Sequence, residues 1–209
     1  MTNQTKIAKK IELEMLLEKT RPHPKPNKIL EQYTLTADLA GLILRCAAYS
    51  HDDVQGKQVI DLGCGTGRLA IGAALLYADS VVGVDIDPLA VKIAKVNAEI
   101  IGVEKRMSWI VSDIDSVKGY YDTVLQNPPF GVRRRGADLK FLEKAMDVAG
   151  VVYSLHKSGK GNRKFISNFV KKLGREITGI IQTEFEIPPI FEFHRRRRHT
   201  VIVDLYRVK

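Results

Sequence analysis

Short apolar runs alternate with longer amphipathic segments along most of the chain, which is the pattern of strands followed by helices. Strand-like runs lie at 58–67, which ends in a glycine-rich turn, and at 80–87, 107–113, 121–126, 150–157, 177–187 and 199–208. Helices are expected at 68–78, 88–101, 138–149 and 162–174. This alternation predicts an α/β fold with a doubly wound, mostly parallel sheet and a terminal hairpin.

The first fifty residues follow a different pattern. Apolar residues recur at i, i+4 within 7–20, and a more apolar segment at 36–50 predicts a second helix. Between them, three alternating prolines favour an extended connector. We therefore expect a single domain over 1–209, in which an N-terminal helical extension (1–50) precedes a Rossmann-like core (51–209).

The charge balance indicates the class of partner. The 209 residues carry a formal net charge of +9. Such a charge favours a polyanionic partner, through counterion release and electrostatic steering. The simpler interpretation is that the charge serves solubility alone.

The sequence predicts a cytoplasmic protein that does not enter a membrane. No apolar run reaches the length of a membrane span, and the charged N-terminal residues contain no apolar leader segment. Cys46 and Cys64 are too few for a disulfide framework or a zinc site. We therefore expect reduced thiols and no bound metal.

A glycine-rich turn, Asp61-Leu-Gly-Cys-Gly-Thr-Gly67, follows the first predicted strand of the core. In open α/β sheets, ligands bind beyond the carboxyl ends of the strands. Glycines at positions 63, 65 and 67 allow a tight turn and a close approach of a ligand. A dinucleotide fingerprint would need a glycine at position 68, where this chain has Arg68, so a nicotinamide cofactor is disfavoured. The alternative is a plain strand-to-helix turn.

An aspartate ends each of the first three predicted strands of the core. These residues are Asp61, Asp85 and Asp113. A carboxylate at the position of Asp85 can accept hydrogen bonds from both hydroxyls of a ribose. Asp113 could accept a hydrogen bond from an adenine amino group, or it could be a helix cap or a solvated loop residue.

These segments resemble the motifs of class I S-adenosylmethionine-dependent methyltransferases, over about residues 57–208. "DLGCGTG" is similar to their first motif, "VDID" to the second and "SD" to the third. The resemblance implies a seven-stranded sheet whose last strand is antiparallel, with S-adenosyl-L-methionine as the cofactor. It implies cofactor contacts by Asp61, Gly63, Gly65, Thr66 and Gly67 in the first motif, by Asp85 at the ribose, and by Asp113 and Ile114 at the adenine.

The predicted strand at 121–126 runs into Asn127, Pro128, Pro129 and Phe130. Beside a methyl-donor pocket, this turn suits methyl transfer to an exocyclic amine on a planar base. The Asn127 side-chain oxygen and the Pro128 carbonyl could each accept one N–H, which aims the nitrogen lone pair at the methyl group. The prolines stiffen the turn, and Phe130 could stack on the base, a contact worth about 1–3 kcal/mol. The alternative is an Asx-Pro turn that only ends a strand.

The Asn-Pro-Pro-Phe turn resembles the motif of enzymes that methylate adenine N6, cytosine N4, guanine N2 or a protein glutamine. In this order, "ILEQY" (29–33), "NPPFG" (127–131), "VYSLHK" (152–157) and "FHRRR" (193–197) resemble the methyltransferase-like protein 5 family. The resemblance extends over about residues 28–208. It implies an adenine-N6 methyltransferase of small-subunit ribosomal RNA.

The same resemblance implies further contacts and a partner. It places Gln32 and Thr66 at the cofactor, and it implies a small zinc-binding activator subunit. The family's threonine three residues after the glutamine is replaced here by Leu35, which lies between Thr34 and Thr36. Which of these two threonines serves in its place is left open.

Three groups of basic residues are expected to track RNA phosphates around the Asn127 pocket. They comprise Arg133, Arg134 and Arg135 after the turn, Lys157, Lys160, Arg163 and Lys164 after the fifth strand, and Arg195, Arg196, Arg197 and Arg198 before the last strand. His156 could contact the substrate or could be an ordinary packed histidine. The alternative for each basic group is a solvated face.

Three other functions are compatible with the sequence. Guanine-N2 methylation of RNA can use a very similar turn. Protein-glutamine N5 methylation shares the cofactor but usually has tyrosine in place of Phe130, and it does not require arginine clusters. A nucleic-acid-binding module without catalysis is the third, although the intact turn at Asn127 disfavours it.

Overall fold

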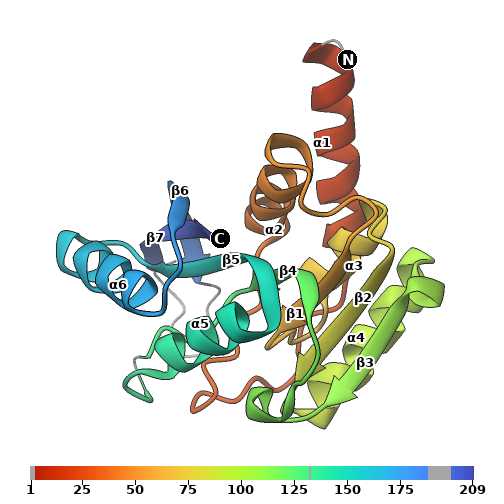
Figure 1. Ribbon diagram of the computed structural model, residues 1–209. Coiled ribbons are helices and arrows are strands. Elements are labelled where there is room, and N and C mark those ends of the chain that lie inside the picture. The colour runs from red at the N-terminus through yellow and green to blue at the C-terminus, as the bar shows by residue number, and fades with distance from the viewer. Residues whose placement is uncertain (1–2, 132, 188–198) are drawn as a thin grey trace.

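The structure, a computed structural model, describes residues 3–131, 133–187 and 199–209. In this part of the chain, seven strands form one sheet in the order β3-β2-β1-β4-β5-β7-β6 (Figure 1). The strands are β1 (Gln58–Leu62), β2 (Ser80–Asp85), β3 (Met107–Val111), β4 (Tyr121–Gln126), β5 (Ala149–Lys157), β6 (Ile177–Ile187) and β7 (His199–Val208). β7 runs antiparallel to its neighbours β5 and β6, and the other pairs are parallel. The predicted doubly wound, seven-stranded fold with an antiparallel last strand is confirmed.

The helices follow the predicted pattern closely. They are α1 (Asn3–Glu18), α2 (Ala37–Arg45), α3 (Arg68–Leu75), α4 (Pro88–Ile101), α5 (Ala137–Val148) and α6 (Lys160–Lys172). α2 continues as a π-helical turn, Cys46–Ser50, and two short 3₁₀ segments occupy Glu104–Arg106 and Ile114–Ser116. α4 has the predicted bounds because its ends are well marked in the sequence. Asp87 caps its first turn by accepting from the Leu89 amide (2.8 Å), Pro88 begins it, and Gly102 ends it with φ +80°.

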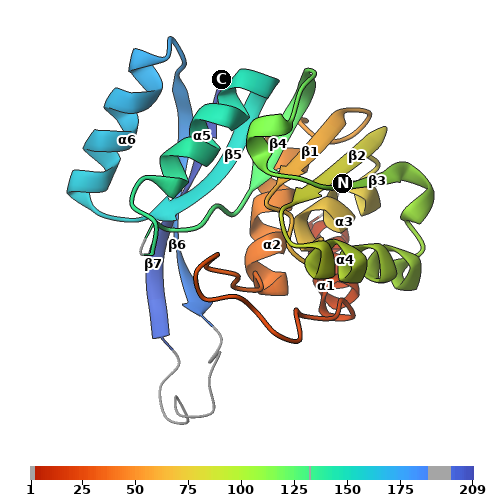
Figure 2. The same ribbon diagram turned by 90° about the horizontal axis from the view of Figure 1, so that it is seen from below.

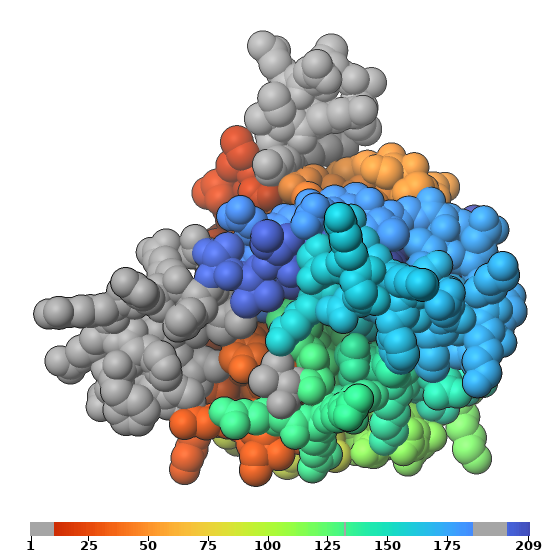
Figure 3. Space-filling view, turned by 90° about the vertical axis from the view of Figure 1, so that its left-hand side faces the viewer, coloured from red at the N-terminus to blue at the C-terminus, as the bar shows by residue number. Residues whose placement is uncertain are grey.

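Side chains alternate across the sheet, so neighbouring residues of one strand enter two different cores. On one face, Val59, Val81 and Leu125 pack with side chains of α1 to α4. On the other face, Ile60 and Val84 pack with α5 and α6. Figure 2 shows the two helical layers on opposite sides of the sheet. The space-filling view in Figure 3 shows α6 and the C-terminal strands on a common face of the molecule.

The buried face of the N-terminal helix is not formed by the apolar residues whose spacing predicted the helix. Leu13 and Leu17 are buried against α2 and α3. Ile11 and Met15, whose i, i+4 spacing predicted the helix, are 51% and 61% exposed. The spacing identified the helix correctly, but it did not identify the buried face.

The segment between α1 and α2 is held by polar contacts to the core, and we call it the N-terminal connector (residues 19–36). Asn97 of α4 accepts from the Arg21 amide (2.8 Å), and its amide group donates to the carbonyls of Arg21 (3.0 Å) and Thr66 (2.9 Å). Arg68 donates to the Thr20 hydroxyl (2.9 Å) and to the Leu35 carbonyl. These contacts fix both ends of the connector against the core.

Replacing Asn97 with Ala should lower the free energy of unfolding by about 2–4 kcal/mol, because a buried side chain loses three hydrogen bonds together. Denaturant unfolding of both proteins measures the difference. Asn168→Ala is the matched control, since Asn168 is an exposed residue of another helix. A loss below about 1 kcal/mol for Asn97→Ala would contradict this account of the connector.

Candidate active site

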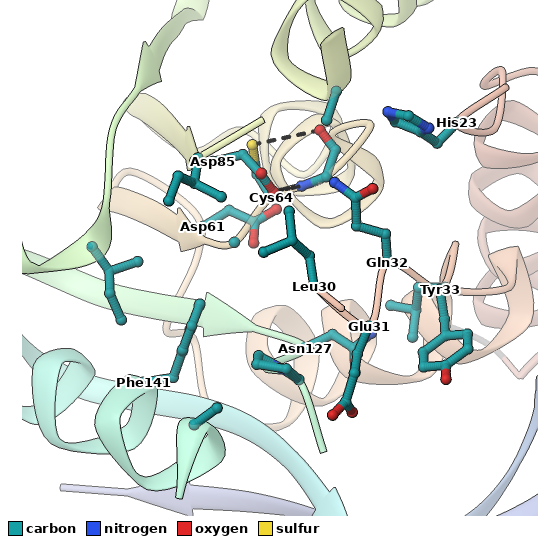
Figure 4. A pocket seen from close by; sticks show the side chains of 18 of the residues that line it. His23, Leu30, Glu31, Gln32, Tyr33, Asp61, Cys64, Asp85, Asn127 and Phe141 are labelled. Atoms are coloured by element: carbon teal, nitrogen blue, oxygen red, sulfur yellow. Dashed lines mark hydrogen bonds between the residues drawn. The ribbon is translucent and has the colours of Figure 1, made fainter. Parts of the chain in front are cut away.

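A cavity of about 380 Å³ lies at the carboxyl ends of β1 to β4. Its walls come from the turns after these strands, from the N-terminal connector and from the start of α5. This volume falls in the range of small-molecule sites, roughly 300–1,000 Å³. The predicted site residues that line it are Gln32, Asp61, Gly63, Gly65, Thr66, Asp85, Asp113, Ile114, Asn127, Pro129, Arg134 and Arg135. Figure 4 shows Asp61 and Asp85 at one end of the cavity and Asn127 at the other.

The turn after β1 requires glycine where it meets aromatic side chains. The amides of Gly63 and Cys64 donate to the Val84 carbonyl (2.8 and 2.9 Å), which ties the turn to β2. Gly63 has φ +70°, and a Cβ there would lie 2.8 Å from the Phe141 ring. At Gly67, with φ +88°, a Cβ would lie 2.7 Å from Trp109. Gly67 therefore packs against Trp109 and does not line the cavity.

Asp61 and Asp85 are buried carboxylates that face the cavity. Asp61 accepts from the Ala70 amide (3.0 Å) at the start of α3, and burial raises its pKa to about 7. Asp85 accepts from the amides of Gly65 (2.7 Å) and Asp87 (2.9 Å). Burial also raises the pKa of Asp85, although these two hydrogen bonds oppose the shift.

Asp113 lies in a more open environment than the other two aspartates. It caps the short helix at Ile114–Ser116 by accepting from the Asp115 amide (3.0 Å), and it pairs with Lys140 at 3.3 Å. The Asp115 hydrogen bond is the largest cause of its lowered pKa, and Lys140 contributes to it. Asp113 is therefore both a helix cap and a residue of the cavity wall, two roles that the sequence left as alternatives.

Gln32 lies on the cavity wall with both ends of its side chain engaged. Its amide group donates to Asp87 (2.8 Å), and its oxygen accepts from the Asn27 amide (2.7 Å). His23 contacts the same Asp87 carboxylate at 3.1 Å. Of the two threonines left open, Thr34 lines the cavity and Thr36 precedes α2. Asp87 thus anchors the connector over the cavity.

The turn after β4 brings an unsatisfied acceptor to the cavity. Oδ1 of Asn127 is buried and has no hydrogen-bond partner among the residues that the structure describes. Pro128 is buried, and Pro129 joins Asn127 on the cavity wall. The half-buried Phe130 ring packs edge-on against Phe185, with ring centroids 6.2 Å apart. The turn therefore presents one free oxygen on a rigid backbone.

The predicted basic groups lie in different places. Arg134, Arg135 and Lys140 line the cavity, and Arg133 is exposed beside them. Lys157 is half-buried, with Lys160 and Lys164 exposed nearby on α6. Arg163 pairs with Asp204 at 2.6 Å. Arg195, Arg196, Arg197 and Arg198 lie outside the described residues.

His156 is buried and is not accessible to an RNA chain in this structure. It is 2% exposed, its Nε2 lies 2.8 Å from the Ser154 hydroxyl, and its Nδ1 lies 3.6 Å from Asp138. The order Ser-His-Asp resembles a nucleophilic triad, but Ser154 is fully buried and cannot reach a substrate. The packed-histidine alternative describes this residue better than direct substrate contact.

Sequence reasoning missed several residues of the cavity, among them Glu31 and Phe141, and one support beneath it. Glu31 and Phe141 line the cavity, and Asn97 holds the Thr66 carbonyl behind the glycine turn. Glu31 stands beside Gln32 in "ILEQY", so its position in that motif was an available signal. Phe141 and Asn97 carried no signal, because their roles depend on contacts between helices and distant turns.

Comparisons with known proteins point to methyltransferases. The model of ribosomal protein L11 methyltransferase (PrmA) matches residues 44–128. The METTL5 rRNA N(6)-adenosine-methyltransferase of Danio rerio is 35% identical, over 94% of this chain and 96% of its own length. MJ0284 of Methanocaldococcus jannaschii is 37% identical, over 97% of this chain and 95% of its own.

A solved structure agrees with the sequence relatives. It belongs to PH1948 of Pyrococcus horikoshii, which is described as a proposed RNA methyltransferase. It superposes with a TM-score of 0.89 at 34% identity, over 97% of this chain and 98% of that one. Within the described part of the chain, no helix is long and apolar enough to cross a membrane.

Asp61 should make the free energy of unfolding depend on pH. Its pKa rises from 3.8 to about 7 on folding, so the stability it provides is present at acid pH and is lost as pH rises to about 7. Asp61→Asn removes this loss. The variant should therefore gain on the order of 2 kcal/mol over the wild type between pH 5 and pH 8, at about 1.4 kcal/mol per pKa unit.

Denaturant unfolding at the two pH values tests this expectation. Asp79→Asn is the control, because Asp79 is exposed and lies outside the cavity. If the stability difference between Asp61→Asn and the wild type were equal at both pH values, the shift assigned to Asp61 would be wrong.

Proposed function

The chain belongs to the class I S-adenosylmethionine-dependent methyltransferases, and we propose that it methylates adenine N6 in small-subunit ribosomal RNA. Its cofactor is S-adenosyl-L-methionine, and it is related to METTL5 and to the archaeal MJ0284 and PH1948. The METTL5 relatives of fish, fly and nematode are all named as rRNA adenosine methyltransferases. What we propose for this chain is the substrate, ribosomal RNA, and the methylated base, adenine.

The cavity fits this cofactor in shape and in charge. The bare Gly63 backbone leaves room at the floor, where a side chain would meet Phe141. We propose that Asp61, Gly63, Gly65 and Thr66 hold the methionine part. We further propose that Asp85 holds the ribose, that Asp113 and Ile114 hold the adenine, and that Gln32 closes the wall. When bound, S-adenosylmethionine supplies an electrophilic methyl group on a sulfonium.

One observation supports the proposed chemistry most directly, namely the unpartnered Oδ1 of Asn127 at the cavity wall. A buried acceptor without a donor costs stability, so its retention indicates a ligand that supplies the donor. A primary amine on a planar base has N–H groups and no strong competing acceptor on the same nitrogen. Asn127 is therefore suited to hold the substrate amine.

The rest of the turn can orient that amine. In our proposal, the carbonyl of Pro128 accepts the second N–H, which draws the nitrogen towards tetrahedral geometry and frees its lone pair. The two prolines restrict the backbone, so little entropy is lost when the amine binds. Phe130 lies next to the cavity residue Pro129, where we propose that it stacks on the base, and the N-terminal connector shields the reacting atoms from water.

The charge around the cavity favours a nucleic-acid substrate. Arg134, Arg135 and Lys140 line the cavity, and the chain as a whole carries +9. Cationic side chains at the mouth of a base-sized cavity can hold phosphates on either side of an inserted base. Protein-glutamine and guanine-N2 methylation remain alternative outcomes of the test. A relative named as a proposed protein N5-glutamine methyltransferase, MJ0928 of Methanocaldococcus jannaschii, is 34% identical over 62% of this chain.

Incubation with unmodified small-subunit RNA and S-adenosylmethionine that carries a deuterated methyl group should yield labelled N6-methyladenosine. Digestion and nucleoside mass spectrometry identify the product. Labelled N2-methylguanosine would overturn the adenine assignment and keep the amine chemistry. If no nucleoside is labelled even with a zinc-binding activator subunit present, RNA is the wrong substrate, and labelled protein glutamine becomes the expected product.

Asn127→Ala should lower the single-turnover methylation rate by about 100-fold or more, because one of the two acceptors for the amine is lost. Cofactor affinity, measured by calorimetry, should stay within about threefold, since the proposed cofactor contacts lie at the other end of the cavity. Asn168→Ala controls for the substitution itself. A variant that retains wild-type turnover would remove Asn127 from the mechanism.

A further inference from the structure

We propose that Glu31 is a catalytic residue, whose free carboxylate oxygen takes up the proton that the substrate amine releases after methyl transfer. The proposal rests on the proposed function of the cavity as an amine methylation site. It concerns a residue of the "ILEQY" segment in which only Gln32 had an assigned role.

Glu31 is a buried acid with one engaged and one free oxygen. The residue is 6% exposed, and its Oε1 accepts from the Arg133 amide at 2.7 Å. Its Oε2 is buried and has no hydrogen-bond partner within the described ranges. A buried carboxylate oxygen without a donor is costly, so this oxygen indicates a ligand with an N–H or O–H group.

Glu31 and Asn127 share one wall of the cavity. Both line it, and Figure 4 shows the two side chains at the same end, away from Asp61 and Asp85. Among the described residues, the cavity therefore has two unpartnered acceptors, Oε2 of Glu31 and Oδ1 of Asn127, at the end where we place the substrate. The Arg133 amide belongs to the loop that follows Asn127, so the contact also holds Glu31 to the catalytic turn.

The backbone at Glu31 is in a conformation that few residues of this kind adopt. Its φ is +51°, in the left-handed region that favours glycine, asparagine and aspartate. Such strain persists where the surroundings enforce it, and it is often found at functional sites. Here the Tyr33 amide donates to the Glu31 carbonyl (2.9 Å), and the Glu31 amide donates to the Lys28 carbonyl (3.2 Å). This local turn holds the side chain at the cavity.

Methyl transfer leaves one proton to be removed from the amine, and Glu31 offers an acceptor for it at this end of the cavity. The amine nitrogen forms a bond to the methyl carbon as the bond from that carbon to sulfur breaks, and the electrons of the broken bond remain on sulfur. The nitrogen then carries a positive charge and one proton more than the neutral product. That proton moves to Oε2 of Glu31 and afterwards to solvent, which leaves the neutral N-methyl amine. The negative carboxylate also stabilises the positive charge that develops on nitrogen.

The test compares Glu31→Gln with the wild type in single-turnover methylation, thermal unfolding and cofactor calorimetry. Glutamine keeps an acceptor for the Arg133 amide and removes the charge and the proton acceptor. The rate should fall by about 100-fold or more, the usual scale for acid–base groups. The Tm should stay equal or rise, because a buried charge is lost, and the cofactor Kd should change by less than threefold. Glu143→Gln, at an exposed position of α5, is the matched control.

The other outcomes each overturn the proposal. A rate within about threefold of the wild type would show that no proton passes through Glu31, and a fall in rate together with a fall in Tm would indicate a structural role. If Glu31→Gln does not fold, Glu31→Asp decides: a tenfold or greater loss of rate at native Tm supports the proposal, and an unchanged rate overturns it.

The proposed function can fail separately from this inference. Rates are measured on whichever amine the wild type labels in mass spectrometry. A guanine or glutamine product would overturn the adenine assignment, and the same comparison of Glu31→Gln with the wild type would still test the proton acceptor.

Discussion

The carboxylate of Asp85 joins the parts of the site. It accepts from the Gly65 amide in the turn after β1 and from the Asp87 amide before α4. These two bonds set the glycine turn relative to the end of β2. Asp87 then caps α4 and accepts from Gln32 of the N-terminal connector. One buried carboxylate thus determines where the floor of the cavity lies, and through Asp87 it also determines where the connector covers it.

Polar groups of different kinds lie in different parts of the cavity. Carboxylates with satisfied backbone contacts lie at the ends of β1 and β2, and the unpartnered oxygens of Glu31 and Asn127 lie at the end of β4. Arg134 and Arg135 stand on the wall near the start of α5. The carboxylates at the ends of β1 and β2 suit a cationic methyl donor. The free oxygens of Glu31 and Asn127 suit an amine, and the two arginines suit a polyanion. The arrangement is consistent with two ligands that meet within one cavity.

Buried polar contacts also anchor the terminal hairpin to the core. Asp53, just before β1, accepts from the Tyr153 hydroxyl (2.5 Å) in β5 and from Arg207 Nε (2.9 Å) in β7. Burial and the neighbouring Asp53 carboxylate raise the pKa of Tyr153, so its hydroxyl keeps its proton and remains a donor. The cluster holds the antiparallel strand β7 beside β5. It thereby fixes the strand that carries Ser154 and His156, beside the β4 strand that leads into the turn at Asn127.

The sequence by itself determined the order and approximate bounds of the strands and helices, because apolar periodicity, Asp87-Pro88 and the glycine turns are local signals. It also determined which residues reach the carboxyl edge of the sheet, since Asp61 and Asp85 lie within the last two residues of β1 and β2 and Asn127 follows β4 directly. Only the tertiary structure decided the roles of Glu31, Asn97 and His156. Their environments come from segments distant along the chain: Glu31 meets the Arg133 loop, Asn97 meets the connector, and His156 is covered by α5 and β7. Burial and hydrogen bonding between distant segments leave no periodic trace in a sequence, whereas strand and helix formation does.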